Sequence, residues 1–281
     1  NIVITGGSGY LGLRLAEFLL TNSFKVILLV SSRSFSNFTN EIDHKNLIVR
    51  KIDWDSKKSI NESVDGGDII LHLAGMNAND CLNNPIEAYK FNALKTRELL
   101  ESAEKLSIKK FIFFSTIHVY KKSLTGFIDE NTPALNNHPY GRSNKAGEDF
   151  VLDYHSAKKI DCLILRISNA FGAPLNKKQN CWSLLINNIS RQIFEDGKII
   201  IHSEPNQHRN FISIKSINKI ILNFIKINKN INDDIIYNIG SDNNLTISQI
   251  AENIKNKYNI IYGKNIYIDY TYQGKTSTYD N

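Results

Sequence analysis

The sequence predicts an α/β fold in which helices cover both faces of a doubly wound parallel sheet. An apolar strand at 2–4 runs into a glycine-rich turn and then into a helical pattern at 10–22. Further apolar runs follow at 26–30, 47–50, 69–73, 111–114 and 163–167. Helical patterns at 85–106 and 140–158 separate the later runs. Strands that alternate with helices in this way are typical of a parallel sheet covered on both sides.

The glycine-rich turn is the most informative segment, Ile-Val-Ile-Thr-Gly-Gly-Ser-Gly-Tyr-Leu-Gly at 2–12. Gly6 permits a tight turn, Gly9 lets the backbone approach a pyrophosphate, and Gly12 lets the helix pack closely on the strand. The N–H groups at the start of that helix, beside Tyr10 and Leu11, suit an anion. A glycine-rich turn can be purely structural, but the strand before it and the amphipathic helix after it favour dinucleotide binding.

Several polar or glycine-containing segments stand where the predicted strands end. They are Gly6–Gly12, Asp53, His72–Gly75 and Ser115–Thr116. Ligands of open parallel sheets bind beyond the carboxyl ends of the strands. We therefore expect these segments to converge on one crevice.

The regular alternation weakens after about residue 170. The remaining patterns are helical stretches at 181–195, 216–228 and 247–258 and short strands near 199–201, 235–239 and 266–270. We interpret 1–168 as a Rossmann-type dinucleotide-binding domain. Residues 169–281 are then mainly a smaller, discontinuous α/β substrate lobe, with parts near 210–240 returning to the Rossmann core.

Composition narrows the functional classes. The chain has 281 residues, 42% of them hydrophobic, which is enough for a large core. Its net charge of +6 comes from Lys and Arg interleaved with acids, so a nucleic-acid partner is not expected. No apolar run approaches the length of a membrane span. The odd set Cys81, Cys162 and Cys181 lacks metal-ligand spacing, which favours free thiols, no metal and a cytoplasmic location.

Two further motifs carry a family resemblance. Ser-Thr-Ile-His-Val-Tyr stands at 115–120, and Pro-Tyr-Gly-Arg-Ser-Asn-Lys stands at 139–145. Together with the glycine turn and His-Leu-Ala-Gly at 72–75, they resemble the extended short-chain dehydrogenase/reductase family. Within it they look like the NAD-dependent sugar-nucleotide epimerase/dehydratase branch, in particular its UDP-galactose 4-epimerase-like members. The resemblance covers about residues 1–260 and implies a homodimer and a role in surface polysaccharide biosynthesis.

The resemblance implies a catalytic set. In this family a tyrosinate takes or gives a hydroxyl proton while a hydride moves to or from a nicotinamide. Tyr140 matches that tyrosine, and Thr116 matches the residue that orients the substrate oxygen. The family's lysine stands four residues after the tyrosine, where this chain has Asn144. Lys145 is displaced by about 100° around an ideal helix, so which of the two holds the nicotinamide ribose stays open.

His118 is a candidate auxiliary acid or base, although a histidine in a loop is more often structural. The 4,6-dehydratases of this branch follow their threonine with an acidic pair, whereas Ile117 and His118 stand here. Dehydration is therefore disfavoured.

The cofactor contacts are also implied by the resemblance. NAD-using relatives place an aspartate at the end of the second strand, but here Val30 is followed by Ser31, Ser32 and Arg33. Ser and Arg can bind a 2′-phosphate, so NADP is slightly favoured over NAD. Asp53 matches a position that contacts adenine. The other implied cofactor contacts are Leu73, Ala74, Gly75 and Asn92.

For the substrate, Arg209 matches an arginine that holds the diphosphate of a nucleotide-sugar, and Asn169 matches an asparagine near the sugar. Asn77 stands where the 4-epimerase has a phosphate-contacting lysine. The expected activity is NAD(P)-dependent epimerisation or oxidoreduction of a nucleotide-sugar, by hydride transfer at C4 through a keto intermediate. One alternative is a ketoreductase or dehydrogenase with an exchangeable cofactor. The other is a catalytically weak NAD(P)-binding sensor or scaffold.

Overall fold

The structure is a computed structural model that describes residues 1–36, 38, 42–121, 126–227 and 234–272. The chain divides into two compact units. The first unit contains Asn1–Ile167 and Ile217–Ile239, and the second contains Ser168–Ser216 and Gly240–Asn281. Each unit is built on its own hydrophobic core.

The first unit contains a parallel sheet of seven strands in the order β10-β6-β5-β4-β1-β2-β3. The strands are β1 (Ile2–Thr5), β2 (Val26–Ser31), β3 (Leu47–Ile52), β4 (Ile69–His72), β5 (Lys110–Thr116), β6 (Asp161–Ile167) and β10 (Ile236–Ile239). Strands such as β2, with its run Val-Ile-Leu-Leu-Val, are apolar throughout because both sheet faces are covered. The predicted doubly wound parallel sheet is confirmed.

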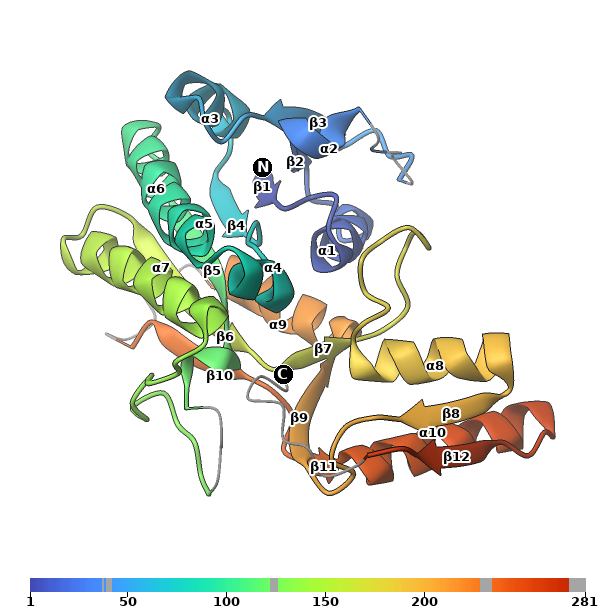
Figure 1. The fold of residues 1–281 in the computed structure, drawn as a ribbon. Helices are drawn as coiled ribbons and strands as arrows, with labels where there is room; N and C mark the ends of the chain where they lie inside the picture. Colours follow the sequence, from blue (N-terminus) through green and yellow to red (C-terminus); the bar gives the residue numbers. More distant parts are fainter. Residues whose placement is uncertain (37, 39–41, 122–125, 228–233, 273–281) are drawn as a thin grey trace. The chain divides into compact units, whose positions relative to one another are not determined.

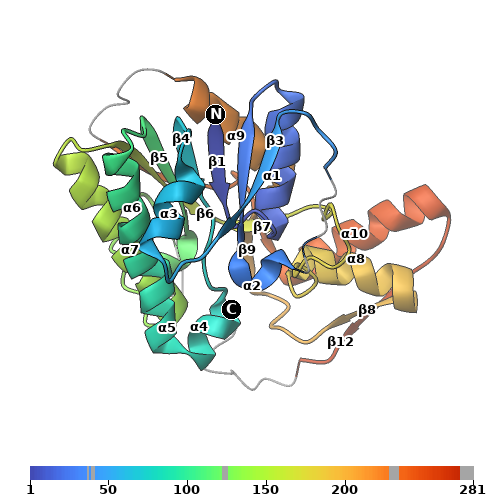
Figure 2. The same cartoon turned by 90° about the horizontal axis from the view of Figure 1, so that it is seen from above.

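Helices cover both faces of this sheet (Figures 1 and 2). One layer holds α1 (Tyr10–Thr21) and the part of α9 (Ile214–Lys226) that belongs to this unit. The opposite layer holds α3 (Lys57–Val64), α6 (Lys95–Lys105) and α7 (Pro139–Ser156). The strand order reverses direction between β1 and β4, which is where ligands bind in doubly wound folds.

The predicted helix at 85–106 is interrupted. It consists of α5 (Pro85–Tyr89), a π-helical turn η1 (Lys90–Leu94) and α6. Single π-turns inside helices are frequent at functional sites. Short elements that precede or follow the main ones are α2 (Ser32–Phe35), α4 (Ala78–Asn83) and the 3₁₀ turn η2 (Ile117–Val119).

The described part of the second unit contains small sheets together with helices. One sheet has the order β11-β9-β7, with β7 (Asn169–Phe171), β9 (His208–Ser213) and β11 (Asn244–Thr246). In the other, β8 (Lys198–Ile201) pairs in parallel with β12 (Tyr267–Tyr270). Helices α8 (Leu185–Asp196) and α10 (Ile247–Tyr262) pack their isoleucines into this unit's core.

Two general expectations are met within the described part of the chain. No described helix combines the length and the apolar character that crossing a bilayer requires. The three cysteines are free thiols, each of them buried.

Candidate functional site

The glycine turn between β1 and α1 brings backbone very close to backbone. Gly6 has φ of +69°, and a Cβ added to it would lie 2.9 Å from the backbone nitrogen of Ala74. A Cβ on Gly12 would collide with the carbonyl oxygen of Gly6. Gly9 is the N-cap of α1 and has no side chain to cap it, and Tyr10 and Leu11 open the first turn. This cradle, which side chains would fill, fits a phosphate at a helix N-terminus.

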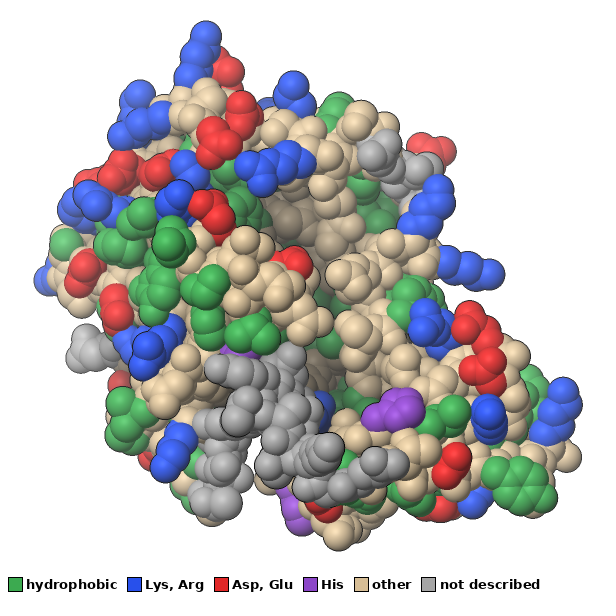
Figure 3. Space-filling view, in the orientation of Figure 1, with side chains coloured by type: hydrophobic (Ala, Val, Ile, Leu, Met, Phe, Trp, Pro, Cys, Tyr) green, Lys and Arg blue, Asp and Glu red, His purple; other side chains and the backbone are tan. Residues whose placement is uncertain are grey.

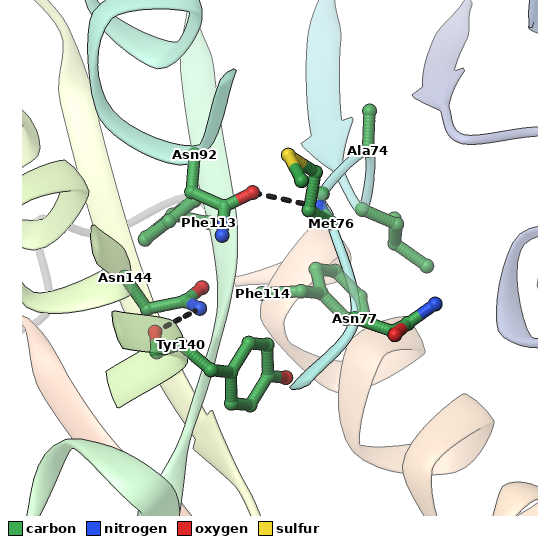
Figure 4. A pocket seen from close by; sticks show the side chains of 10 residues that line it. Ala74, Met76, Asn77, Asn92, Phe113, Phe114, Tyr140 and Asn144 are labelled. Atoms are coloured by element: carbon green, nitrogen blue, oxygen red, sulfur yellow. Dashed lines mark hydrogen bonds between the residues drawn. The ribbon is translucent and has the colours of Figure 1, made fainter. Parts of the chain in front are cut away.

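A cavity of about 210 Å³ lies beside this turn, wholly within the first unit. Its walls come from the segment after β4, from β5, from η1 and from the start of α7 (Figure 4). Because Ala74 both lines the cavity and adjoins Gly6, the cavity begins where the glycine turn ends. The lining residues are Leu73, Ala74, Gly75, Met76, Asn77, Asn92, Phe113, Phe114, Tyr140 and Asn144.

Tyr140 lines this cavity and lies beside Thr116. Tyr140 stands in the first turn of α7 (Figure 4). Thr116 ends β5 and is buried. Burial raises the pKa of the Tyr140 phenol above its usual value, and hydrogen bonding to Thr116 opposes that rise. The Thr116 hydroxyl also accepts the backbone N–H of His118 at 3.1 Å. The His118 ring lies 6.0 Å from the Tyr140 ring, centroid to centroid, at a tilt of 56°.

Asn144 and Lys145 lie on different faces of α7. Asn144 lines the cavity, is buried, and donates from its Nδ2 atom to the Tyr140 carbonyl oxygen at 2.8 Å (Figure 4). Lys145 forms an ion pair with Asp149. It also lines a second cavity, whose walls include other residues of α7 and residues 134–137. The displacement by one residue therefore turns the lysine away from Tyr140, as the helix geometry predicts.

His72 holds the backbone of the cavity wall in place. Its Nε2 atom lies 3.0 Å from Thr96 Oγ1, which donates its own proton to the Asn92 carbonyl. The imidazole must then donate at Nε2 and accept from Thr5 Oγ1 at Nδ1, 2.7 Å away. Thr5 Oγ1 accepts the N–H groups of Leu73 and Ala74. Burial lowers the pKa of His72 to about 3, so this ring stays neutral.

Asn92 uses its side-chain amide within the protein, although it also lines the cavity. Its Oδ1 atom accepts the Met76 N–H at 2.7 Å, and its Nδ2 atom donates to Ser143 Oγ at 2.9 Å. The same nitrogen lies 3.5 Å from the Cys81 sulfur. Asn92 thus ties the segment after β4 to α7, and the π-turn places it there.

The ends of β2 and β3 lie side by side, since Ser31 pairs with Ile52. The Asp53 carboxylate, directly after β3, accepts the Asp55 N–H at 3.1 Å. Arg33 is 87% exposed and lies 3.7 Å from the Asp55 carboxylate. The structure therefore brings together the residues that the sequence associates with the adenosine end of a cofactor.

The residues predicted to bind substrate are divided between the units. Asn77 caps α4 in the first unit, where its side chain bonds both the N–H and the carboxylate of Asp80. In the second unit, Asn169 in β7 donates to the Asn210 carbonyl at 2.9 Å. Arg209 in β9 donates to Gln207 at 3.0 Å.

A buried ion pair supports the strand that carries Thr116. Arg166 donates from two nitrogens to the Glu148 carboxylate, at 3.0 and 2.7 Å, and both side chains are buried. Ser115, the neighbour of Thr116, donates to Glu148 at 2.5 Å. The pair connects β5, β6 and α7, and sequence reasoning missed it.

Sequence reasoning also missed the roles of Thr5, Thr96, Ser143 and Cys81. Thr5 and Ser143 have partners that are distant in the chain, since Thr5 bonds His72 at a separation of 67 residues and Ser143 bonds Asn92 at a separation of 51. The one signal available was the polar His72 at the end of an otherwise apolar strand.

Comparison with known proteins gives a consistent result. The family model described as "NAD dependent epimerase/dehydratase family" matches residues 2–240. A putative UDP-glucose 4-epimerase of Methanocaldococcus jannaschii is 27% identical over 261 residues, which are 91% of this chain and 82% of that protein. The human dTDP-D-glucose 4,6-dehydratase is 26% identical over 265 residues, 90% of this chain and 73% of that protein.

Solved structures share the fold. The UDP-N-acetylglucosamine 4-epimerase from Methanobrevibacter ruminantium, in complex with UDP-N-acetylmuramic acid, superposes with a TM-score of 0.82. The match covers 99% of this chain and 86% of that one, at 23% sequence identity. The family resemblance drawn from the sequence motifs is confirmed.

Proposed function

The chain belongs to the NAD dependent epimerase/dehydratase family, and from this premise we propose that it catalyses hydride transfer at one carbon of a nucleotide-activated sugar. The site is the cavity of the first unit, with the glycine turn at its end. Two relatives that are similar over most of this chain are named as a putative UDP-glucose 4-epimerase and a dTDP-D-glucose 4,6-dehydratase. A nucleoside diphosphate sugar is therefore the proposed substrate class.

One observation carries the proposal. A phenol and a threonine hydroxyl, from α7 and β5, interact at a cavity that adjoins a phosphate-sized glycine cradle. A hydroxyl pair of this kind can hold a sugar oxygen and move a proton to or from it. In this proposal Tyr140 transfers the proton and Thr116 orients the oxygen.

A nicotinamide dinucleotide would lie along the carboxyl ends of the strands. When bound, it would supply the hydride that this chain's side chains cannot provide. Gly6, Gly9 and Gly12 would leave room for its pyrophosphate, and Leu73, Ala74 and Gly75 would flank it. Asn144 lines the cavity and Lys145 does not, which supports Asn144 as the proposed α7 contact of the ribose.

Both NAD and NADP remain candidates, and we propose a modest preference for NADP. Ser31 ends β2 without a carboxylate, and Arg33 follows it with an exposed guanidinium. A 2′-phosphate would meet hydroxyl and guanidinium donors there. Asp55, close to Arg33, moderates this preference by competing for the guanidinium.

Among the possible reactions we favour epimerisation at C4, or a related oxidoreduction, over dehydration. Dehydratases are similar to this chain as well. However, Thr116 is followed by Ile117 and His118, neither of which is a carboxylic acid for removing a proton and water from adjacent sugar carbons.

Asn169 and Arg209 are the proposed contacts of the nucleotide-sugar in the second unit. A guanidinium binds a diphosphate through paired hydrogen bonds, which is the chemistry proposed for Arg209.

A homodimer is the proposed assembly. Figure 3 shows hydrophobic side chains gathered over the side of the first unit formed by α5 and α7. Ile86 is 72% exposed, and Leu82, Tyr89 and Leu94 are exposed as well. Exposed apolar residues that cluster in this way mark interaction surfaces. Sedimentation of the purified protein, compared with an Ile86→Glu variant, tests this assembly.

The function is tested with the purified chain, NAD or NADP, and UDP-, GDP-, CDP- and dTDP-sugars. We expect binding of one dinucleotide by calorimetry and conversion of at least one sugar by product analysis. Turnover without added dinucleotide would indicate an epimerase, and turnover that consumes it would indicate a reductase or dehydrogenase.

A catalytically weak sensor remains the second candidate, because Asn144 stands where the family has a lysine. Dinucleotide binding with no sugar converted, and with no change of behaviour in Tyr140→Phe, would favour the sensor. Failure to bind either dinucleotide would contradict both proposals.

A further inference from the structure

We propose that the cavity of the first unit holds its proton donor ready for reduction at neutral pH: Tyr140 donates a proton to the carbonyl oxygen of a keto-sugar nucleotide, and Asn144, which is uncharged, is the residue that leaves the phenol in this proton-donating form. The inference rests on the proposed function and narrows it: of the reactions proposed there, it selects reduction of a keto-sugar nucleotide over epimerisation, because an epimerase must also remove a hydroxyl proton.

The cavity holds no formal charge in the described part of the chain. Of its ten described lining residues, Tyr140 is the one that titrates, and none is Lys, Arg, Asp or Glu. The cations of α7 are directed elsewhere. Lys145 pairs with Asp149, and Arg142 donates to the Asn136 carbonyl and to Asn137. Lys145 and Arg142 both line the second cavity.

The groups that face Tyr140 come from several elements. Thr116 at the end of β5 hydrogen-bonds to it, and His118 in η2 presents a tilted ring. Cys81 in α4 is close enough to raise the pKa of the phenol, while its own pKa is raised by burial. His138, the N-cap of α7, accepts the Tyr140 backbone N–H through Nδ1. An imidazole that accepts at Nδ1 has at most one proton, on Nε2, and is neutral.

Asn144 occupies the position on α7 from which a cationic side chain would lower the pKa of the Tyr140 phenol. It follows Tyr140 by four residues, so both lie on one face of the helix, and both line the cavity. Its amide is buried and donates to the Tyr140 carbonyl oxygen. An amide cannot be protonated near neutral pH, so it adds no positive charge to favour a phenolate.

The protonation state of the phenol follows. With burial as the largest influence, the pKa of Tyr140 lies above its usual value of about 10. At pH 7 fewer than about one molecule in a thousand then carries the phenolate. A reaction in which Tyr140 must remove a hydroxyl proton depends on this rare phenolate form. A reaction in which Tyr140 must donate a proton uses the abundant phenol form.

The proposed step balances as follows. A hydride, with two electrons, adds to the carbonyl carbon of the keto-sugar, and the reduced dinucleotide that is its source becomes oxidised. The π pair of the C=O bond moves to oxygen, which takes the phenolic proton as the O–H bond of Tyr140 breaks. Thr116 holds this oxygen beside the phenol, and the phenolate is reprotonated from solvent.

The first test needs no cofactor. Tyrosinate absorbance is titrated in the wild-type chain and in Tyr140→Phe, and the difference gives the ionisation of Tyr140. We expect no Tyr140 tyrosinate below about pH 10. The same titration in Asn144→Lys should show ionisation at a pH lower by about one unit or more, because a cation now faces the phenol. Asn144→Met, which adds length but no charge, should leave the titration unchanged.

The second test uses catalysis in both directions. The rate of oxidation of the alcohol sugar nucleotide should rise about tenfold for each pH unit between about pH 7 and about pH 9, while the rate of reduction of the keto sugar stays flat. Asn144→Lys should raise oxidation at pH 7 by roughly tenfold or more and flatten its profile. Asn144→Met should retain the steep profile.

The outcomes separate this inference from the proposed function. Tyr140 ionisation near neutral pH, or a flat oxidation profile in the wild type, would overturn the inference while leaving the function intact. A chain that binds neither dinucleotide nor nucleotide-sugar would instead overturn the proposed function.

Discussion

Two polar clusters of the first unit, one around His72 and one around Tyr140, meet at Asn92 and use their hydrogen-bonding groups very differently. Around His72, both ring nitrogens and both threonine hydroxyls are paired, and the ring is buried and neutral. Around Tyr140, the phenol lines a cavity and hydrogen-bonds to the buried Thr116 hydroxyl. The comparison teaches that a closed polar cluster fixes the backbone, whereas an open one keeps its proton-carrying groups available to a ligand.

The largest expected effect concerns acid stability and comes from the closed cluster. His72 has a folded-state pKa of about 3 and an unfolded-state pKa of about 6.5. Between these two pH values the unfolded chain therefore binds a proton at His72 that the folded chain does not bind. The stabilisation is fully present above about pH 6.5 and is lost as the pH falls toward 3. As the pH falls below about 6.5 the free energy of unfolding should decrease, and below about pH 5.5 its slope should approach roughly 1.4 kcal/mol per pH unit.

Urea unfolding at several pH values measures this slope. The exposed His208 provides the control, since His208→Gln should retain the slope and His72→Asn should lose most of it. An equal slope in both variants would show that the His72 cluster does not exclude protons.

The next largest effects are expected in a matched pair of variants, Thr96→Val and Thr116→Val. Removing the Thr96 hydroxyl leaves His72 Nε2–H and the Asn92 carbonyl without their buried partner, so unfolding should become easier by about 1–3 kcal/mol. Removing the Thr116 hydroxyl should lower turnover of a nucleotide-sugar about tenfold to a hundredfold, because the reacting oxygen loses its positioning bond.

Unfolding curves and steady-state rates of the two variants check the pair. Thr96→Val should retain nearly normal turnover per folded molecule, whereas Thr116→Val, which loses the bond to the His118 N–H, should lose about 1 kcal/mol of stability but most of its turnover. The reverse pattern would contradict the division into a closed and an open cluster.

A smaller effect is expected at Asn92, which belongs to both clusters. Asn92→Ala removes the bonds to Met76 and Ser143, and each lost bond of this kind costs about 1 kcal/mol. We expect lower stability together with weaker dinucleotide binding, since the segment after β4 loses its tie to α7. Calorimetric titration with the dinucleotide measures the second effect. Weakened stability with unchanged affinity would restrict Asn92 to the fold.

The smallest effect is expected at Lys145. Its ion pair with Asp149 is an i,i+4 pair on a partly exposed face of α7. Such pairs contribute about 0.3–0.5 kcal/mol, so Lys145→Ala should barely change stability. It should also leave turnover unchanged, in contrast to Asn144. A large loss of activity would show that Lys145 reaches the reaction site.

Most of the sheet could be predicted from the sequence because its strands are buried on both faces. β2 and β5 read as continuous apolar runs and were found within one or two residues of their ends. The elements that were missed are short or polar. β9 reads His-Arg-Asn-Phe-Ile-Ser, and α3 has only Ile60 and Val64 as large apolar residues. Neither pattern differs enough from a loop to be recognised.

The site was predictable where a motif fixes the backbone or a spacing fixes a helix face. The glycine turn, Tyr140 and the divergence of Asn144 from Lys145 all follow from local geometry. The pairing of His72 with Thr5 and Thr96, and of Arg166 with Glu148, joins residues distant in the chain. Such contacts depend on tertiary packing, which a single sequence does not display.

The central claim is that the Tyr140 phenol exchanges a proton with a sugar oxygen while a hydride is transferred. Its most direct test is a single-turnover measurement of nicotinamide absorbance after mixing the dinucleotide-loaded protein with the converted sugar nucleotide, in the wild type and in Tyr140→Phe. We predict that both proteins bind both ligands and that the variant's absorbance change is slower by about a hundredfold or more. Equal rates in the two proteins would contradict the account.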